Sequence, residues 1–138
     1  MKRLLLAAAT AVGILAGCGH GGASSTVALP FGRHANGHDL TAAVRALCDS
    51  ADQARTDLAK ASSAFYLRSH SQLHILAEAL GPQAARILEA MYIVEQDIAA
   101  RPPRSGLATD LSSLATVAGS GLTSLRLSAP ACTTRTPP

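Results

Sequence analysis

The sequence predicts an all-α fold, a small antiparallel four-helix bundle closed by a disulfide and preceded by a signal peptide and a flexible tether. Three observations lead to this prediction. Apolar side chains recur every three or four residues through four segments. Glycine, serine or proline separates the segments, and two cysteines lie towards the ends of the helical region. Short connections between amphipathic helices favour antiparallel neighbours.

The N-terminus has the pattern of an export signal. Lys2 and Arg3 precede an uncharged apolar run over residues 4–16, and Leu15-Ala16-Gly17-Cys18 follows. The run is shorter than the roughly 20 residues that a membrane span needs, so we expect a processed signal peptide over residues 1–17. The tetrapeptide resembles the lipobox of bacterial lipoproteins. That resemblance implies lipidation of Cys18 and anchoring on the extracytoplasmic side of the cell membrane. The alternative is an ordinary secretory signal with Cys18 merely near the cleavage site.

The composition of the mature chain limits its partners. The full chain carries a formal charge of +3, and removal of Lys2 and Arg3 leaves +1. A nearly neutral chain with 3% aromatic residues does not have the character of a nucleic-acid platform. Residues 18–38 contain the lipidated cysteine followed by a glycine-rich stretch without apolar periodicity, which we expect to be a flexible tether with a reach on the order of 25 Å.

The first two helices are predicted from one long apolar stripe and from the loss of its regular spacing further along the chain. Asp39 is the expected N-cap of a helix that extends to about residue 61. Its stripe consists of Leu40, Val44, Leu47, Ala51, Ala54, Leu58 and Ala61. Ser62-Ser63 is the expected turn. A second helix over residues 64–80 buries Leu73, Leu76, Ala77 and Leu80.

The last two helices are separated by proline. Gly81 ends the second helix, and Pro82 opens a third, which stops at Pro102-Pro103. Its apolar set is Ile87, Met91, Val94 and Ile98. The fourth helix, over residues 107–127, carries Leu107, Leu111, Leu114, Ala118, Leu122 and Leu125. Within it, Gly119-Ser120-Gly121 either breaks the helix or lets another backbone approach closely, and we favour the close packing.

The cysteines predict one disulfide. Lipidation of Cys18 leaves Cys48 and Cys132 as a pair, and thiols oxidise readily outside the cytoplasm. In an up-down-up-down bundle the end of helix four lies near the start of helix one, which brings the two cysteines together. Closing so large a loop stabilises by roughly 4 kcal/mol. The alternative is two free thiols that serve as soft metal ligands. The predicted domain is residues 39–132, and residues 133–138 are a disordered tail.

A candidate metal site lies on the second helix. His70 and His74 are four residues apart, and Glu78 follows one turn later. Helical geometry places His70 about 60° and His74 about 100° from Leu73, so His70 borders the core and His74 faces solvent. Two imidazoles at this spacing can chelate Zn²⁺ or copper, with Glu78 adding an oxygen. The alternative is that His70 is a boundary residue bonded to a carbonyl and that His74 is simply solvated.

Further ligands for this site could come from the third helix, namely from Glu89, Met91, Tyr92 or Glu95. The motif His70-Ser-Gln-Leu-His74 is not the H-E-x-x-H motif of zinc proteases, because Ser71 stands where the general base belongs. His20, His34 and His38 lie in the expected tether, where they bind metal weakly if at all.

Residues 65–100 resemble small exported actinobacterial helical proteins, some of them associated with copper-handling genes. The resemblance rests on Phe65, His70, Leu73-His74, Leu76-Ala77 and Leu88-Glu89-Ala90. It implies copper as a candidate ligand.

No catalytic motif is present in the sequence. It lacks a G-x-S-x-G elbow, a P-loop and a dinucleotide fingerprint, and Asp49, Asp52 and Asp57 fit the solvated face of a helix. We therefore expect a non-catalytic, membrane-anchored helical domain that binds an envelope protein partner. The alternative is a copper- or zinc-binding envelope lipoprotein that uses His70 and His74.

Overall fold

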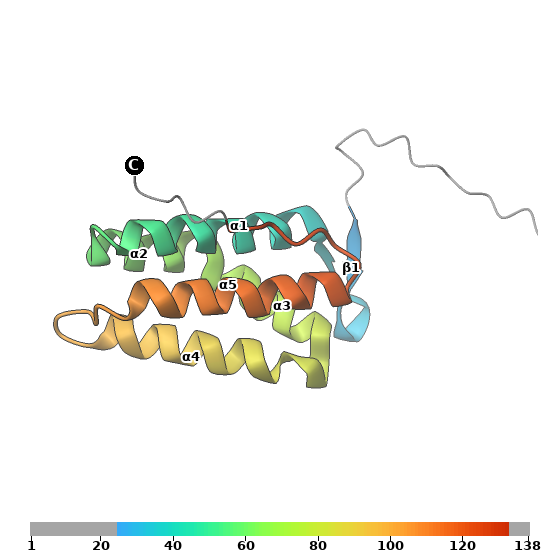
Figure 1. The fold of residues 1–138 in the computed structure, drawn as a ribbon. Coiled ribbons are helices and arrows are strands. Elements are labelled where there is room, and N and C mark those ends of the chain that lie inside the picture. The colour runs from blue at the N-terminus through green and yellow to red at the C-terminus, as the bar shows by residue number, and fades with distance from the viewer. Residues whose placement is uncertain (1–24, 133–138) are drawn as a thin grey trace, which may run out of the picture.

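The computed structural model describes residues 25–132, which form a mostly helical fold with one two-stranded sheet (Figure 1). The α-helices are α1 (Gly37–Ala54), α2 (Leu58–Phe65), α3 (Ser71–Leu80), α4 (Ala85–Ala99) and α5 (Leu107–Ser124). A π-helical segment, Tyr66–His70, joins α2 to α3, and a 3-10 helix, Gly81–Ala84, joins α3 to α4. The predicted signal peptide, the lipidated Cys18 and the tail over residues 133–138 lie outside the described residues.

A β-hairpin stands where a flexible tether is predicted. Strand β1 (Thr26–Ala28) pairs antiparallel with β2 (His34–Asn36), and Val27 lies opposite Ala35. Val27 is buried, and the Gly37 N–H donates to the Ser25 carbonyl, which ties the hairpin to the start of α1. The tether prediction is therefore wrong for residues 25–38. Strands of three residues are too short to show an alternating pattern in the sequence.

The first helix begins and ends at positions other than those predicted. The Asn36 side chain, and not that of Asp39, caps α1 by accepting a hydrogen bond from the His38 N–H at 2.9 Å. The chain turns at residues 55–57, and Asp57 caps α2 by accepting from the Lys60 N–H at 3.0 Å. Ser62 and Ser63 lie inside α2, and the Ser62 hydroxyl donates to the Leu58 carbonyl at 2.7 Å, one turn earlier. The predicted turn at Ser62-Ser63 is therefore wrong, since the chain turns before α2 instead.

The core forms where the helices meet, and the predicted apolar stripes supply it. Helix α5 packs against both α1 and α4, and α3 contacts α1, α4 and α5. In Figure 1, α5 runs between α1 and α4. The largest fully buried side chains are Phe65, Leu40, Leu47, Leu73, Leu76, Ile87, Met91, Leu107, Leu111, Leu114, Leu122 and Val44. The helical periodicity of the sequence is thus confirmed as the source of the core.

Helix α5 passes through Gly119-Ser120-Gly121 without a break. A Cβ atom at Gly121 would lie 2.8 Å from Leu80 Cδ1 and 3.0 Å from Ile87 Cδ1. The absent side chain therefore admits two buried side chains from the corner between α3 and α4. The predicted close packing at this glycine is therefore present, but side chains, and not the predicted backbone, make the approach. The helix ends at Ser124, short of the predicted residue 127, and Arg126 follows in a left-handed conformation.

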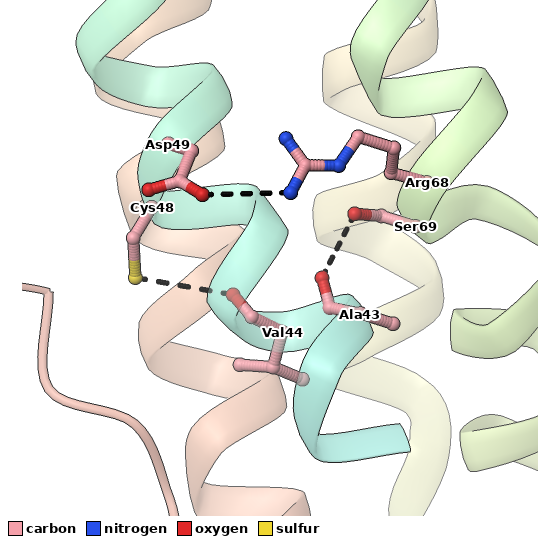
Figure 2. A network of polar contacts seen from close by, with 6 residues as sticks. All are labelled: Ala43, Val44, Cys48, Asp49, Arg68 and Ser69. Carbon is pink, nitrogen blue, oxygen red and sulfur yellow. Dashed lines mark hydrogen bonds and ion pairs between the residues drawn. The ribbon is translucent and has the colours of Figure 1, made fainter. Parts of the chain in front are cut away.

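The predicted disulfide is present. Cys48 of α1 is bonded to Cys132, which follows α5, and their Cα atoms are 5.2 Å apart. The Cys48 sulfur also lies 3.8 Å from the Val44 carbonyl oxygen (Figure 2). A disulfide sulfur carries no proton, so this approach is a packing contact. The bond fixes the C-terminal segment to α1.

Candidate metal site

The site begins with the π-helical segment, which is held against α1 by two polar contacts (Figure 2). The hydroxyl of Ser69 donates to the Ala43 carbonyl at 2.8 Å, and Ser69 is 1% exposed. On the surface, an Arg68 nitrogen lies 3.6 Å from an Asp49 carboxylate oxygen. Single π turns occur often at functional sites, since the extra residue reorients the side chains that follow. Here the side chain at the end of the π-helical segment is His70.

His70 points from this segment towards α4. Its Nε2 atom lies 2.9 Å from Oε1 of Glu95, and the side chains are 29% and 32% exposed respectively. His74, one turn further along α3, is exposed, and its ring centroid lies 4.7 Å from that of His70 in an edge-to-face arrangement. The helical angles predicted this difference in burial between the two histidines.

Three ligand-capable side chains converge at this point. One donor atom from each of His70, His74 and Glu95 lies within 4.8 Å of the others. Two neutral imidazole nitrogens and one carboxylate oxygen are a donor set that suits Zn²⁺ and Cu²⁺. The donors come from the π-helical segment, from α3 and from α4, so a bound ion would join the first two elements to α4.

Glu78 does not take part in this cluster. Its carboxylate forms an ion pair with Arg33 of the hairpin. The prediction of Glu78 as the third ligand is therefore wrong, because a cation from another part of the chain binds that carboxylate. Of the side chains considered on the third predicted helix, Glu95 reaches the histidines, whereas Met91 is buried in the core.

Tyr66 forms the aromatic border of the cluster. Its ring centroid lies 5.0 Å from that of His70, and Phe65 packs against His70 at 5.7 Å from the side of the core. Burial, and secondly the negative charge of Glu95, raise the pKa of the Tyr66 phenol. The phenol is therefore protonated at neutral pH and offers no anionic ligand.

The other histidine pair does not form a site. His34 lies in β2 and His38 in the first turn of α1, so the two do not share one helical face. Both are exposed, and neither belongs to the cluster of metal-ligating groups. His20 lies outside the described residues.

A buried carboxyl group lies where α4 leads into α5, and sequence reasoning missed it. Asp97 is 4% exposed, and Arg104 Nη1 lies 3.8 Å from its Oδ1. Burial, and secondly the neighbouring carboxyl group of Asp110, raise the pKa of Asp97 to about 6, although Arg104 acts in the opposite direction. Among the described residues, no group forms a hydrogen bond with Oδ2 of Asp97. The sequence did offer one signal of this burial: Asp97 follows Val94 by three residues and so falls on the apolar stripe of α4.

No protein-family model, curated protein or solved structure matches this chain. Within residues 25–132, no helix has both the length and the apolar character that crossing a bilayer requires. Function is therefore argued from the site itself.

Proposed function

We infer that this chain is a lipid-anchored, extracytoplasmic protein that binds Zn²⁺ or Cu²⁺ through His70, His74 and Glu95. The observation that carries the proposal is the convergence of their donor atoms within 4.8 Å. None of these three side chains belongs to the buried apolar core. Imidazole and carboxylate donors favour these borderline divalent ions over Cu⁺, which prefers sulfur.

The exposure of the three ligands supports reversible binding. His74 is exposed, and the His70 and Glu95 side chains are about one-third exposed. Zinc that serves a structural role takes four protein ligands, whereas a three-ligand set leaves a position for water or for another molecule. We assign the site to buffering or delivery of the ion, and not to turnover, because Ser71 stands where a zinc protease has its general base.

The lipid anchor in this proposal rests on Leu15-Ala16-Gly17-Cys18, and localisation at the outer side of the cell membrane follows from it. The domain in this proposal is an antiparallel four-helix bundle in which α2 and α3 together form the second helix. Packing of α5 on both α1 and α4, and of α3 on all three, supports that arrangement.

Binding of an envelope protein partner is a second candidate function, and exposed apolar side chains on α4 favour it. Leu88 and Tyr92 lie one turn apart with exposures of 45% and 61%, and neighbouring Ile93 is 44% exposed. A photo-crosslinker at position 92 tests this function in cells. A discrete adduct that Leu88→Ser and Ile93→Ser both abolish supports it, and an adduct insensitive to both substitutions argues against it.

Metal titration tests the main proposal. The mature chain with Cys18→Ala is titrated with Zn²⁺ and Cu²⁺, and binding is followed by calorimetry. We expect one ion per chain with submicromolar affinity, and loss of that binding in the double variant His70→Ala/His74→Ala. The matched control is His34→Ala/His38→Ala, which removes the other histidine pair of equal spacing and should change nothing. Equal effects of the two double variants would overturn the proposal.

A further inference from the structure

The tip of the hairpin presents a fully exposed aromatic side chain. Phe31 is 101% exposed, and its neighbours Pro30, Gly32 and Arg33 are also exposed. Phe31 adopts φ 62° and ψ 32°, a left-handed conformation that is unusual for a bulky residue. Residues 25–132 thus give this side chain no burial in return for a strained backbone. A contact with a surface outside these residues would account for the strain.

The hairpin holds this tip in a defined place. The Leu29 N–H donates to the Arg33 carbonyl at 2.9 Å across the turn. Arg33 is also paired with Glu78 of α3, and Val27 is buried against the helices. The aromatic side chain therefore extends from an ordered support.

The hairpin lies at the end of the domain from which the chain leads to Cys18. Ser25, the first described residue, accepts a hydrogen bond from the Gly37 N–H, and both Ser25 and Leu127 lie next to the Cα of Gly37. Strand β1 lies beside the C-terminal end of α5 (Figure 1). Arg126, at this same end, is exposed and adds a positive charge.

Only residues 19–24 separate Cys18 from this end. A fully extended chain spans about 3.5 Å per residue, so Ser25 lies within roughly 25 Å of the anchor, and a flexible chain of that length has a typical span of about 15 Å. The hairpin thus replaces most of the predicted tether and keeps this end of the domain beside the bilayer.

From these observations we propose that the hairpin tip is a membrane-contact surface, in which Phe31 enters the interfacial region of the phospholipid bilayer to which Cys18 is attached. The inference rests on the lipid anchor of the proposed function. Aromatic side chains favour the boundary between headgroups and acyl chains. Arg126 at the same end suits the phosphate groups that all phospholipids share.

The absence of tryptophan from the chain permits a specific test. Phe31→Trp places a single tryptophan at the tip, and Leu67→Trp places one at a residue that is 85% exposed on the π-helical segment, as the matched control. Each mature lipidated protein is reconstituted into phosphatidylcholine vesicles with brominated acyl chains, which quench tryptophan fluorescence within the membrane. We expect a blue-shifted and strongly quenched emission for Phe31→Trp and unquenched emission for Leu67→Trp.

Intact mass measured before reconstitution separates the two proposals. A lipid mass on Cys18 with equal emission from both variants would overturn the membrane contact and leave the anchor intact. A protein without lipid on Cys18 would overturn the anchor and, with it, the basis for the contact. The metal titration described above is independent of both results.

Discussion

Glu95 Oε1 lies 2.9 Å from His70 Nε2, although 25 positions separate the two residues in the chain. The contact joins α4 to the π-helical segment and places a carboxylate beside two imidazoles. It selects Glu95 as the third ligand of the proposed site, in place of Glu78.

Glu95→Gln is expected to weaken Zn²⁺ binding at least tenfold, because the amide oxygen is a neutral and poorer ligand. Loss of even an outer partner of a metal site costs about 10–100-fold in affinity. Glu78→Gln is the matched control and should leave the affinity unchanged, since Glu78 is paired with Arg33. Calorimetric titration of both variants measures the effect, and a larger loss from Glu78→Gln would contradict the assignment.

The stability of the protein should fall as the pH rises through the pKa of Asp97. This pKa is raised from 3.8 to about 6, so the folded state binds more protons than the unfolded state between these values. The contribution of Asp97 to the free energy of unfolding is therefore fully present below about pH 4, and it is lost as the pH rises past 6. Asp97→Asn should remove this fall and raise the free energy of unfolding at pH 8 by roughly 2 kcal/mol. Urea unfolding at several pH values measures it. The control, Asp49→Asn, alters an exposed carboxylate, and an identical pH profile for the two variants would refute the prediction.

Reduction of the Cys48–Cys132 disulfide should lower the free energy of unfolding by roughly 4 kcal/mol, because the bond closes a loop that spans 84 positions. Urea unfolding with and without a reductant measures the difference. In Cys48→Ala/Cys132→Ala the reductant should have no effect. A wild-type unfolding curve that does not shift on complete reduction would show that the loop contributes nothing.

Gly121→Val should destabilise the fold by about 1–3 kcal/mol, because the new side chain would collide with Leu80 and Ile87. Ser120→Val is the matched control, since it introduces the same residue at an exposed neighbouring position. Thermal unfolding of the two variants should show a lower midpoint for Gly121→Val. Equal midpoints would mean that the corner between α3 and α4 accommodates the added side chain without loss of stability.

The sequence predicted two kinds of feature. Helices were predicted from the regular spacing of apolar residues, and the disulfide was predicted because two cysteines remain once the third is assigned to lipidation. Apolar stripes led by Leu47, Leu73 and Leu111 are buried as expected, and Cys48 and Cys132 are bonded. These predictions succeeded because burial of an apolar face is the main determinant of helix packing.

The features that sequence reasoning missed depend on contacts between distant residues. The hairpin relies on burial of Val27 against the helices, and the π-helical segment is bound to α1 through Ser69 and Ala43. Arg33 pairs with Glu78, and the packing of α4 brings Glu95 to His70. A helical pattern in the sequence reveals neither of these contacts, so it could not show which glutamate is the third ligand.

The disulfide also has a mechanical consequence. A pull applied between Ser25 and Cys132 passes from Cys48 directly to Cys132 through a covalent bond. The chain between these cysteines, which contains α2, α3, α4 and α5, would then bear no tension. Of the residues that the structure describes, those of the hairpin and of α1 before Cys48 would extend. All three residues of the proposed metal site lie within the part that is shielded from force.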